Sequence, residues 1–402
     1  MSVRTLVAAA AGLLLSVASP AAQPQWVDVI RNLRNPKPET RLDSLQKLES
    51  AAYVGAIEPV AELITDSDDR VQAAAIDAEL TFFLTERVAG SRSLAGSGSK
   101  SRAQVAFDTG PLVRGAGIAP PILISRLIAA IRDENARVRF DAVHALGFIG
   151  EAPLGASESR ALALELDHYD PIIRAATARV IGRLRAAEAG DKLIAGLSDS
   201  NALVRLYAIE SLGWLRHERA AAALRDLVAR GRGEEPAMAL FALARIASQE
   251  DRERFRQRLA DKSAAMRRSA LEGVARVSDR DSLEAARKMA ASDSSASVKL
   301  AGAFAVQLLG GDVQTHTIAS MLVVDDLTAQ AREYLFELGR TAVPGIESVL
   351  KVATDSRHRA DLIQAVGYVG TLDDVPTLEP FLRDRDERVS RAAGHAIARL
   401  RR

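Results

Sequence analysis

Few side chains in this sequence have the types and the spacing that metal chemistry requires. The six histidines include no His-Glu-x-x-His pair, and none has an Asp or Glu at a ligand spacing that recurs elsewhere. Asp167, His168 and Asp170 come nearest to a metal-binding set, but they fall in a turn before Pro171, where aspartate caps a helix and proline starts one. The sequence therefore predicts no metal site and no cofactor.

Candidate nucleophiles and phosphate loops are also weak. Residues 96–101, GSGSKS, resemble a phosphate loop in composition, yet Ser99 separates Gly98 from Lys100 and no strand precedes the segment. Ser97 and Lys100 have the spacing of a serine nucleophile and its lysine, without the partner motifs of such enzymes. The chain has no cysteine, which excludes thiolate chemistry. These observations favour a protein without catalytic activity.

The elements that would position any functional side chain repeat along the chain. The position of Gly147 within its repeat has an equivalent in each following repeat, at intervals of 28 to 35 residues. Eight residues before this position there is usually a basic residue, and six positions before that there is usually an aspartate. The basic positions are Arg139, Arg174, Arg205, Arg267, Lys299 and Arg359. Because a residue that stays in place in every unit serves the stack, we expect these side chains to pair with turn aspartates of their own or neighbouring units.

Each unit also holds an earlier amphipathic segment, such as ILISRLIAAIRD before Glu134. Its apolar residues recur at three and four positions, which is typical of a helix with one buried stripe. Aromatic residues make up only 4% of the chain, and the abundant Ala, Leu, Arg and Glu favour helices. We predict an all-α fold, a solenoid of about eleven helical hairpins that bury their apolar faces against one another.

Three stretches carry a family resemblance: DENARVRFDAVHALGFIG (133–150), DSNALVRLYAIESLGWL (199–215) and DRDERVSRAAGHAIARL (384–400). They resemble HEAT repeats, in the short form of the HEAT-like phycobilisome-lyase proteins. The resemblance covers nearly all of residues 25–402. It implies a right-handed superhelix in which the helix carrying Val-Arg lines the concave side. The fold does not fix an activity, since this family mostly supplies scaffolds.

Two segments stand outside the repeats. Residues 1–22 have one basic residue, an apolar run from Leu6 to Val17 and a small-residue exit, which is the layout of a secretory signal peptide. The solenoid then occupies 23–402, with no membrane span expected after cleavage. An extra segment rich in Gly, Ser and Arg, at about 89–119, interrupts the regular spacing of the repeats, and we expect a flexible loop there.

The concave column predicted from the resemblance is the candidate binding surface. It comprises residues two, five and nine after each Val-Arg arginine, which share one helix face. Its candidate partner-binding members are His144, Phe148, Arg179, Arg183, Tyr207, Glu210, Trp214, Phe241, Arg245, Arg276, Phe304, Phe336 and Tyr368. We expect Arg179, Tyr207 and Trp214 to be accessible, whereas Phe241, Phe304 and Phe336 fit the surface and the core equally well.

The sequence thus predicts an exported, periplasmic or secreted scaffold whose concave face binds a protein or peptide, without catalysis. One alternative is a bilin-lyase-like enzyme or accessory factor, which the family resemblance implies. Another is nucleic-acid binding, for which the concave arginines would supply a partial basic stripe. The near balance of 53 basic and 52 acidic residues argues against a nucleic-acid partner. The oligomeric state stays open.

Overall fold

The computed structural model describes residues 24–86 and 100–402. Over these ranges the regular structure is helical, and the one extended pairing is an isolated antiparallel bridge between Leu84 and Arg114. The prediction of an all-α fold is confirmed.

Eleven helical hairpins follow one another along the described chain, together with one extra helix, α5 (Arg102–Thr109). The first helices of the hairpins form the outer layer: α1 (Pro24–Asn32), α3 (Ile57–Ala61), α6 (Pro121–Ala130), α8 (Ala156–Leu164), α10 (Gly190–Gly196), α12 (Ala221–Arg230), α14 (Arg252–Arg258), α16 (Leu283–Ser292), α18 (Thr315–Ser320), α20 (Val343–Leu350) and α22 (Val375–Leu378). The second helices form the inner layer: α2 (Pro38–Ser50), α4 (Asp69–Phe83), α7 (Ala136–Ile149), α9 (Pro171–Arg183), α11 (Ala202–Trp214), α13 (Glu235–Ile246), α15 (Ala264–Arg276), α17 (Ala296–Leu308), α19 (Asp325–Leu338), α21 (Ser356–Val369) and α23 (Glu387–Leu400).

Arginines at the recurring position tie their own hairpin to the next one. Arg174 donates to the carbonyl of His168 in its own turn and, through two nitrogens, to both carboxylate oxygens of Asp199 in the following unit at 2.8 and 2.9 Å. Arg267 makes the same contacts with its own turn and with Asp293. The expectation that these arginines serve the stack agrees with this geometry.

The turn aspartates order the turn that precedes each helix cap. Asp199 accepts the backbone N–H of Asn201, and the side chain of Asn201 then accepts the N–H groups of Leu203 and Val204 at the start of α11. The aspartate therefore shapes the turn, and the residue two positions later caps the helix.

Several inner helices end on a residue with a left-handed backbone that is not glycine. Ala52, Arg185, Arg216, Ala247 and Ser278 have φ between 46° and 60°. After Arg216, for example, the N–H of the next residue bonds back to the carbonyl of Leu212, which closes the helix end. This repeated turn sets the return path into each following outer helix.

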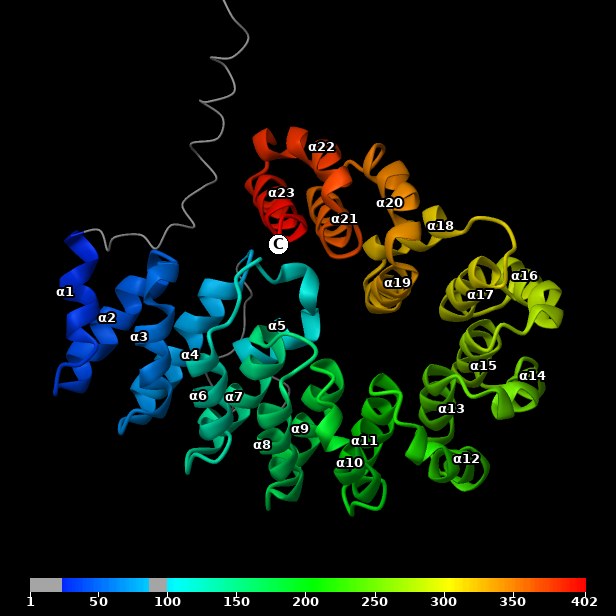
Figure 1. Cartoon of the computed structure of the whole chain (residues 1–402), viewed down its shortest axis with the longest axis horizontal. Coiled ribbons are helices and arrows are strands. Elements are labelled where there is room, and N and C mark those ends of the chain that lie inside the picture. Colours follow the sequence, from blue (N-terminus) through cyan, green and yellow to red (C-terminus); the bar gives the residue numbers. More distant parts are fainter. Residues whose placement is uncertain (1–23, 87–99) are drawn as a thin grey trace, which may run out of the picture.

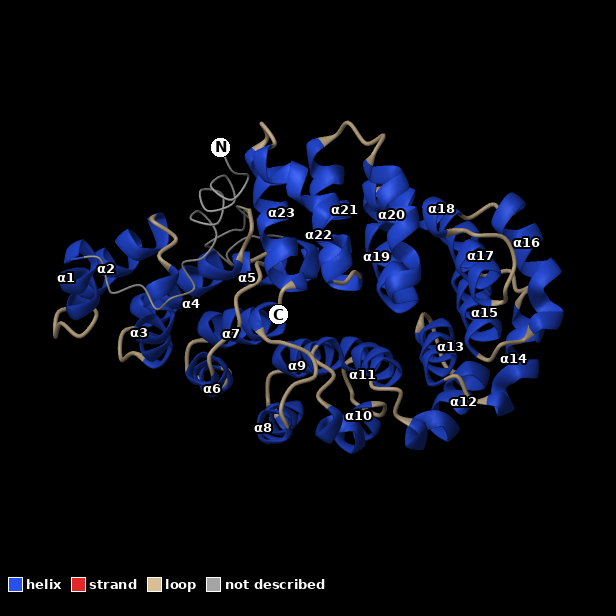
Figure 2. Ribbon diagram, turned by 45° about the horizontal axis from the view of Figure 1, so that its top comes forward, coloured by secondary structure: helices blue, strands red, loops and turns tan. Residues whose placement is uncertain are grey.

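The solenoid bends until its last hairpin approaches its third (Figure 1, Figure 2). Arg402, just after α23, lies 3.3 Å from Glu151, just after α7. The helices α1 to α4 extend beyond this closure as an arm, on the left of Figure 1.

The interruption of the period differs from the expected flexible loop. Residues 89–99 of that loop lie outside the described residues, but 100–119 are folded as α5, a 3-10 turn at Pro111–Val113 and an extended stretch. The physical reason is that the apolar Phe107, Leu112 and Val113 are buried. We call residues 100–119 the insert.

The expected signal peptide, residues 1–22, lies outside the described residues. Among the helices that are described, none has both the length and the apolar character needed to cross a membrane.

Candidate functional site

All the predicted partner-binding residues lie on inner helices. They are His144 and Phe148 on α7, Arg179 and Arg183 on α9, Tyr207, Glu210 and Trp214 on α11, Phe241 and Arg245 on α13, Arg276 on α15, Phe304 on α17, Phe336 on α19 and Tyr368 on α21. None of them is fully exposed. Their degree of burial divides them into core, insert-contacting and lumen-facing groups.

Three of the predicted residues belong to the core and are not available to a partner. Phe304 is fully buried and stacks on Tyr334 with ring centroids 4.1 Å apart. Phe148 is buried within the N-terminal core. His144 is covered by Phe107 of the insert, its Nδ1 lies 2.8 Å from the carbonyl oxygen of Phe140, and burial lowers its pKa to about 4. The column position therefore does not guarantee exposure, because large side chains also turn into the helix-helix interface.

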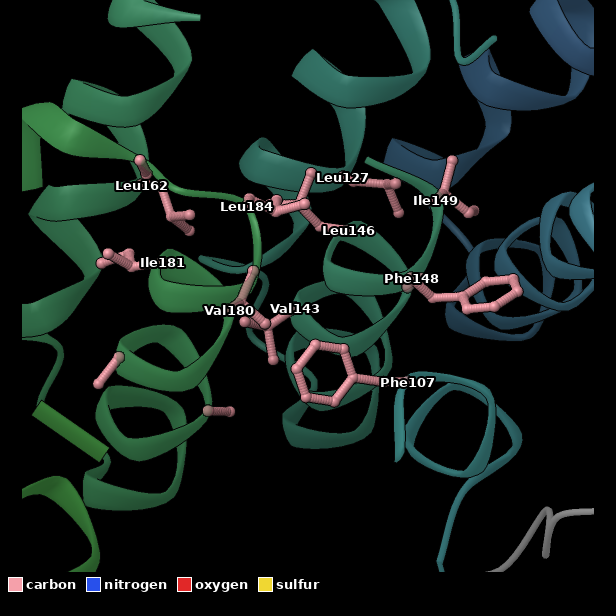
Figure 3. Packing of buried hydrophobic residues seen from close by; sticks show 14 of the residues in the cluster. Phe107, Leu127, Val143, Leu146, Phe148, Ile149, Leu162, Val180, Ile181 and Leu184 are labelled. Atoms are coloured by element: carbon pink, nitrogen blue, oxygen red, sulfur yellow. The ribbon is translucent and has the colours of Figure 1, made fainter. Parts of the chain in front are cut away.

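The insert occupies the inner face of α7 and α9. Figure 3 shows Phe107 reaching toward Val143 and Val180, between the two helices. The guanidinium of Arg179 lies 4.8 Å from the Phe107 ring and bonds the Asp108 carboxylate at 2.6 Å. Arg183 lies 4.5 Å from the same ring and donates to the carbonyl of Phe107. Two predicted arginines thus hold the C-terminal end of α5, where the helix dipole is negative.

Helices from the other end of the chain hold the next part of the insert. Arg332 donates to the Thr109 carbonyl at 3.0 Å, and the Tyr368 hydroxyl donates to the Pro111 carbonyl at 2.9 Å. Arg399, stacked 3.8 Å over the Tyr368 ring, donates to the Arg114 carbonyl at 3.0 Å.

The last contact in this series comes from a histidine on α23. His395 accepts the Ala116 N–H through Nδ1 at 3.2 Å. The insert therefore bridges α7 and α9 to α19, α21 and α23, and it does so mainly through its own main chain.

A charged network fastens α15 to α19 on the inner side. The buried Tyr334 hydroxyl donates to Glu272 at 2.6 Å, and both Arg268 and Arg276 contact the same carboxylate. Burial alone would raise the pKa of Glu272, but Arg268 and Arg276 hold it at about 2. Arg276 also forms two bonds to Glu337 of α19. This predicted partner-binding arginine is therefore already neutralised within the chain.

Aromatic side chains and one arginine line the inner layer next to the insert. Tyr207, Trp214 and Phe241 are half-buried. Trp214 and Phe241 meet edge to face with centroids 6.2 Å apart, and the Arg245 guanidinium lies 3.4 Å from the Trp214 ring centroid. Burial, together with Arg276, lowers the pKa of Arg245 to about 10. None of these side chains contacts the insert through a hydrogen bond.

The arm carries a groove that sequence reasoning missed. A hollow of about 500 Å³ lies between α2, α4 and α7 and is lined in part by Gln46, Glu49 and Arg70. A second one, of about 690 Å³, adjoins it at Gln46, which lines both. Asp43 and Gln46 follow Arg41 by two and five positions, which are the column spacings, so part of this lining has a signal in the sequence.

Within residues 24–86 and 100–402 no three His, Cys, Asp or Glu side chains are grouped as a metal site would require. His168 instead accepts the backbone N–H of Asp170 at 3.0 Å, so it orders the turn before α9.

Comparisons with known proteins identify the repeats. The family model described as HEAT repeats matches residues 159–235. A solved complex of CpcE and CpcF of phycocyanin lyase from Nostoc sp. PCC7120 is similar in structure, with 19% identity, 71% of this chain and 97% of that chain covered, and a TM-score of 0.37. A crystal structure of an engineered protein is similar with 15% identity, 64% and 98% coverage, and a TM-score of 0.35. No curated protein matches this chain.

The chain carries HEAT repeats in a helical solenoid, as the sequence predicted. The prediction that the chain has no catalytic activity is not supported: the lack of a nucleophile motif and of cysteine excludes only those two chemistries, and the similar solved complex is one of a phycocyanin lyase. The likeness itself shows the fold and no activity.

Proposed function

We propose that this solenoid binds a segment of another protein on its inner face. The observation that carries the proposal is the insert, because the inner helices already hold a peptide there. Three of the contacts come from Arg183, Arg332 and Tyr368, and each of them donates to a main-chain carbonyl. Every peptide offers such carbonyls, so the same kind of contact suits a segment of a partner.

The inner layer beside the insert offers anchors of the kind that protein interfaces use. Tyr207, Trp214 and Phe241 are large, partly accessible and adjacent. Trp, Tyr and Arg supply most of the binding energy in protein interfaces. A partner segment that continues from the insert along α11 and α13 would cover them.

Charge on the inner face supports a protein partner over a nucleic acid. Arg179 is paired with Asp108, and Arg276 with Glu272 and Glu337. A nucleic-acid groove needs unpaired basic residues along the phosphate backbone. Two of the four concave arginines are therefore already neutralised within the chain.

We also propose that the protein is exported and acts in the periplasm or outside the cell. The support is the sequence of residues 1–22, with its apolar run and small-residue exit. N-terminal sequencing of the protein expressed in a bacterium should find a mature chain that begins near residue 23. A chain that keeps its first residues would contradict export by this route.

A peptide-display selection on the full chain tests the binding function. Peptides enriched by the wild-type protein should bind the Tyr207→Ala, Trp214→Ala double variant at least about tenfold more weakly, since each side chain is an interface anchor. The matched control is Tyr169→Ala, which removes an exposed aromatic in a turn outside the inner layer.

Two outcomes would contradict the proposal. One is a selection that enriches no peptide. The other is a set of enriched peptides that bind the double variant as well as the wild type. Affinity that falls steeply with salt for nucleic acids, but not for peptides, would favour the nucleic-acid alternative.

A further inference from the structure

Arg245 differs from every other buried arginine in the described chain. It is 8% exposed, yet it donates no hydrogen bond and has no carboxylate oxygen within 4.0 Å. The other arginines of similar burial all have acceptors: Arg41 contacts Asp66, Arg114 contacts Ile149 O, Arg139 contacts Asp133 O, and Arg332 contacts Thr109 O. A guanidinium that is mostly buried and has no protein acceptor is costly, because its donors have lost part of their hydration and gained no hydrogen bond in exchange.

The guanidinium of Arg245 lies over the Trp214 ring and is partly open to solvent. It lies 3.4 Å from the Trp214 ring centroid and 5.5 Å from that of Phe241. Its nitrogens still reach solvent, unlike the sealed Nε atoms of Arg41 and Arg139. Stacking on Trp214 fixes the plane of the donors without accepting any hydrogen bond from them.

The equivalent positions in neighbouring hairpins show what is missing. Arg183 ends α9 as Arg245 nearly ends α13 and Arg276 ends α15. Arg183 donates to a carbonyl of the insert, and Arg276 donates to Glu337. Of these three arginines, only Arg245 on α13 stacks on an aromatic ring and has no hydrogen-bond acceptor.

The insert shows the chemistry of an acceptor that fits. Next to Arg183, Arg179 lies between the rings of Phe107 and Tyr207 and takes the Asp108 carboxylate at 2.6 Å. An arginine stacked on aromatic rings and paired with a carboxylate of a bound segment is therefore already present two hairpins away.

Resting on the proposed function and narrowing it, we propose that Arg245 and Trp214 form a docking point for an acidic side chain of the partner peptide. A carboxylate accepts two parallel bonds from the guanidinium fork and compensates its charge. The nearest carboxylates of the chain do not pair with Arg245. Glu272 and Glu337 form ion pairs with Arg276, and no oxygen of Glu333 lies within 4.0 Å of an Arg245 nitrogen.

The fluorescence of Trp214 reports directly on peptide binding at this docking point. The chain has two tryptophans, so Trp26→Phe leaves Trp214 as the only one. The probe is the acetylated and amidated tetrapeptide Phe-Asp-Thr-Gly, which copies residues 107–110, and its matched control replaces Asp with Asn. In the full-length Trp26→Phe protein we expect a saturable change in Trp214 fluorescence, with the Asn peptide at least about tenfold weaker.

Variants at the arginine complete the test. Arg245→Gln and Arg245→Lys should each weaken the Asp peptide about tenfold or more, since lysine keeps the charge but loses the planar fork. Arg219→Gln, which removes an exposed arginine of the outer side, should leave the binding unchanged.

Equal affinity for the Asp and Asn peptides, or no saturable response, would overturn the docking point. The comparison of the two peptides is made on one protein, so it stands even if a variant at position 245 fails to fold. If display-selected peptides still depend on Tyr207 and Trp214 in that case, the proposed function survives and only the acidic docking point fails.

Discussion

At the scale of single residues, stability comes from arginines that serve two repeats at once. Arg174 satisfies the carbonyls of its own turn and a carboxylate of the next unit. The pairing lowers the pKa of Asp199 below its usual range, mainly through the hydrogen bonds from Arg174. The sequence predicted this role because a basic residue in the same place in every unit serves what the units share.

Replacing Arg174 with Met should remove this link while keeping the apolar stem. We expect the free energy of unfolding to fall by about 1–3 kcal/mol, because two charge-assisted hydrogen bonds are lost and partners are left unpaired. Urea denaturation followed by circular dichroism measures the change. Arg219→Met, in an exposed ion pair, is the control and should change the unfolding midpoint little. Equal effects of the two substitutions would contradict a stabilising role for the link between Arg174 and Asp199.

A second residue-scale prediction concerns the left-handed helix ends. Arg216 has φ 50° and is exposed, so its side chain strains the backbone without a packing gain. Arg216→Gly should raise the free energy of unfolding by about 1 kcal/mol, because glycine adopts this conformation without the Cβ clash. Arg230→Gly, at a helical residue, should lower it by a similar amount. Thermal unfolding distinguishes the two signs.

At the scale of elements, the periodic hairpins were predictable and the insert was not. The hairpins repeat a pattern of apolar residues over many turns, which identifies them as helices. Helix α5 is only eight residues long, follows a Gly/Ser-rich run and has no counterpart elsewhere in the chain. Its order comes from burying Phe107 against α7 and α9, and no local pattern shows which helices will receive that ring.

Substitutions at two helical glycines test how α5 packs against α7. A Cβ at Gly147 would come within 2.7 Å of Phe107 and Val180 atoms, whereas a Cβ at Gly394 would meet nothing within 4 Å. Gly147→Ala should therefore destabilise the chain by about 1–3 kcal/mol and speed amide hydrogen exchange in α5. Gly394→Ala should stabilise it by about 0.5–1 kcal/mol through helix propensity. Unchanged exchange in α5 after Gly147→Ala would mean that α5 does not depend on this packing.

At the scale of the whole molecule, the insert closes the solenoid by joining repeats that are distant in sequence. Leu112 packs in the C-terminal core, while Phe107 and Val113 pack in the N-terminal one. Arg388 adds an ion pair to Glu86 across the same closure. Most solenoid contacts link neighbouring units only, so this closure couples the two ends of the array.

The closure should weaken in acid through His395. Burial, with Arg399 and Arg391, lowers its pKa to about 4 from the ordinary 6.5. The unfolded chain therefore binds more protons than the folded chain between these values, and stability falls as the pH drops from 6.5 toward 4. For this group the loss is about 2 kcal/mol by pH 5.

His395→Gln keeps an acceptor for the Ala116 N–H but does not titrate. The loss of unfolding free energy between pH 7.5 and pH 5 should be smaller in this variant by about 2 kcal/mol. His144, whose pKa is lowered in the same direction, contributes equally to both proteins and cancels in the difference. Parallel pH profiles for the two proteins would show that His395 does not titrate at the closure.

The repeat unit and the stacking role of arginines such as Arg174 were predictable from periodicity and from contacts between neighbouring units, which lie close in sequence. The division into inner and outer helices, with Trp214 and Arg245 on the inner side, was what the resemblance to HEAT repeats implied. The folding of 100–119 onto the inner face, the covering of His144 and the lack of an acceptor for Arg245 are visible in the three-dimensional structure alone. Those outcomes depend on the accumulated curvature of the array, which brings α19 to α23 back to the insert, and no local spacing encodes that distance.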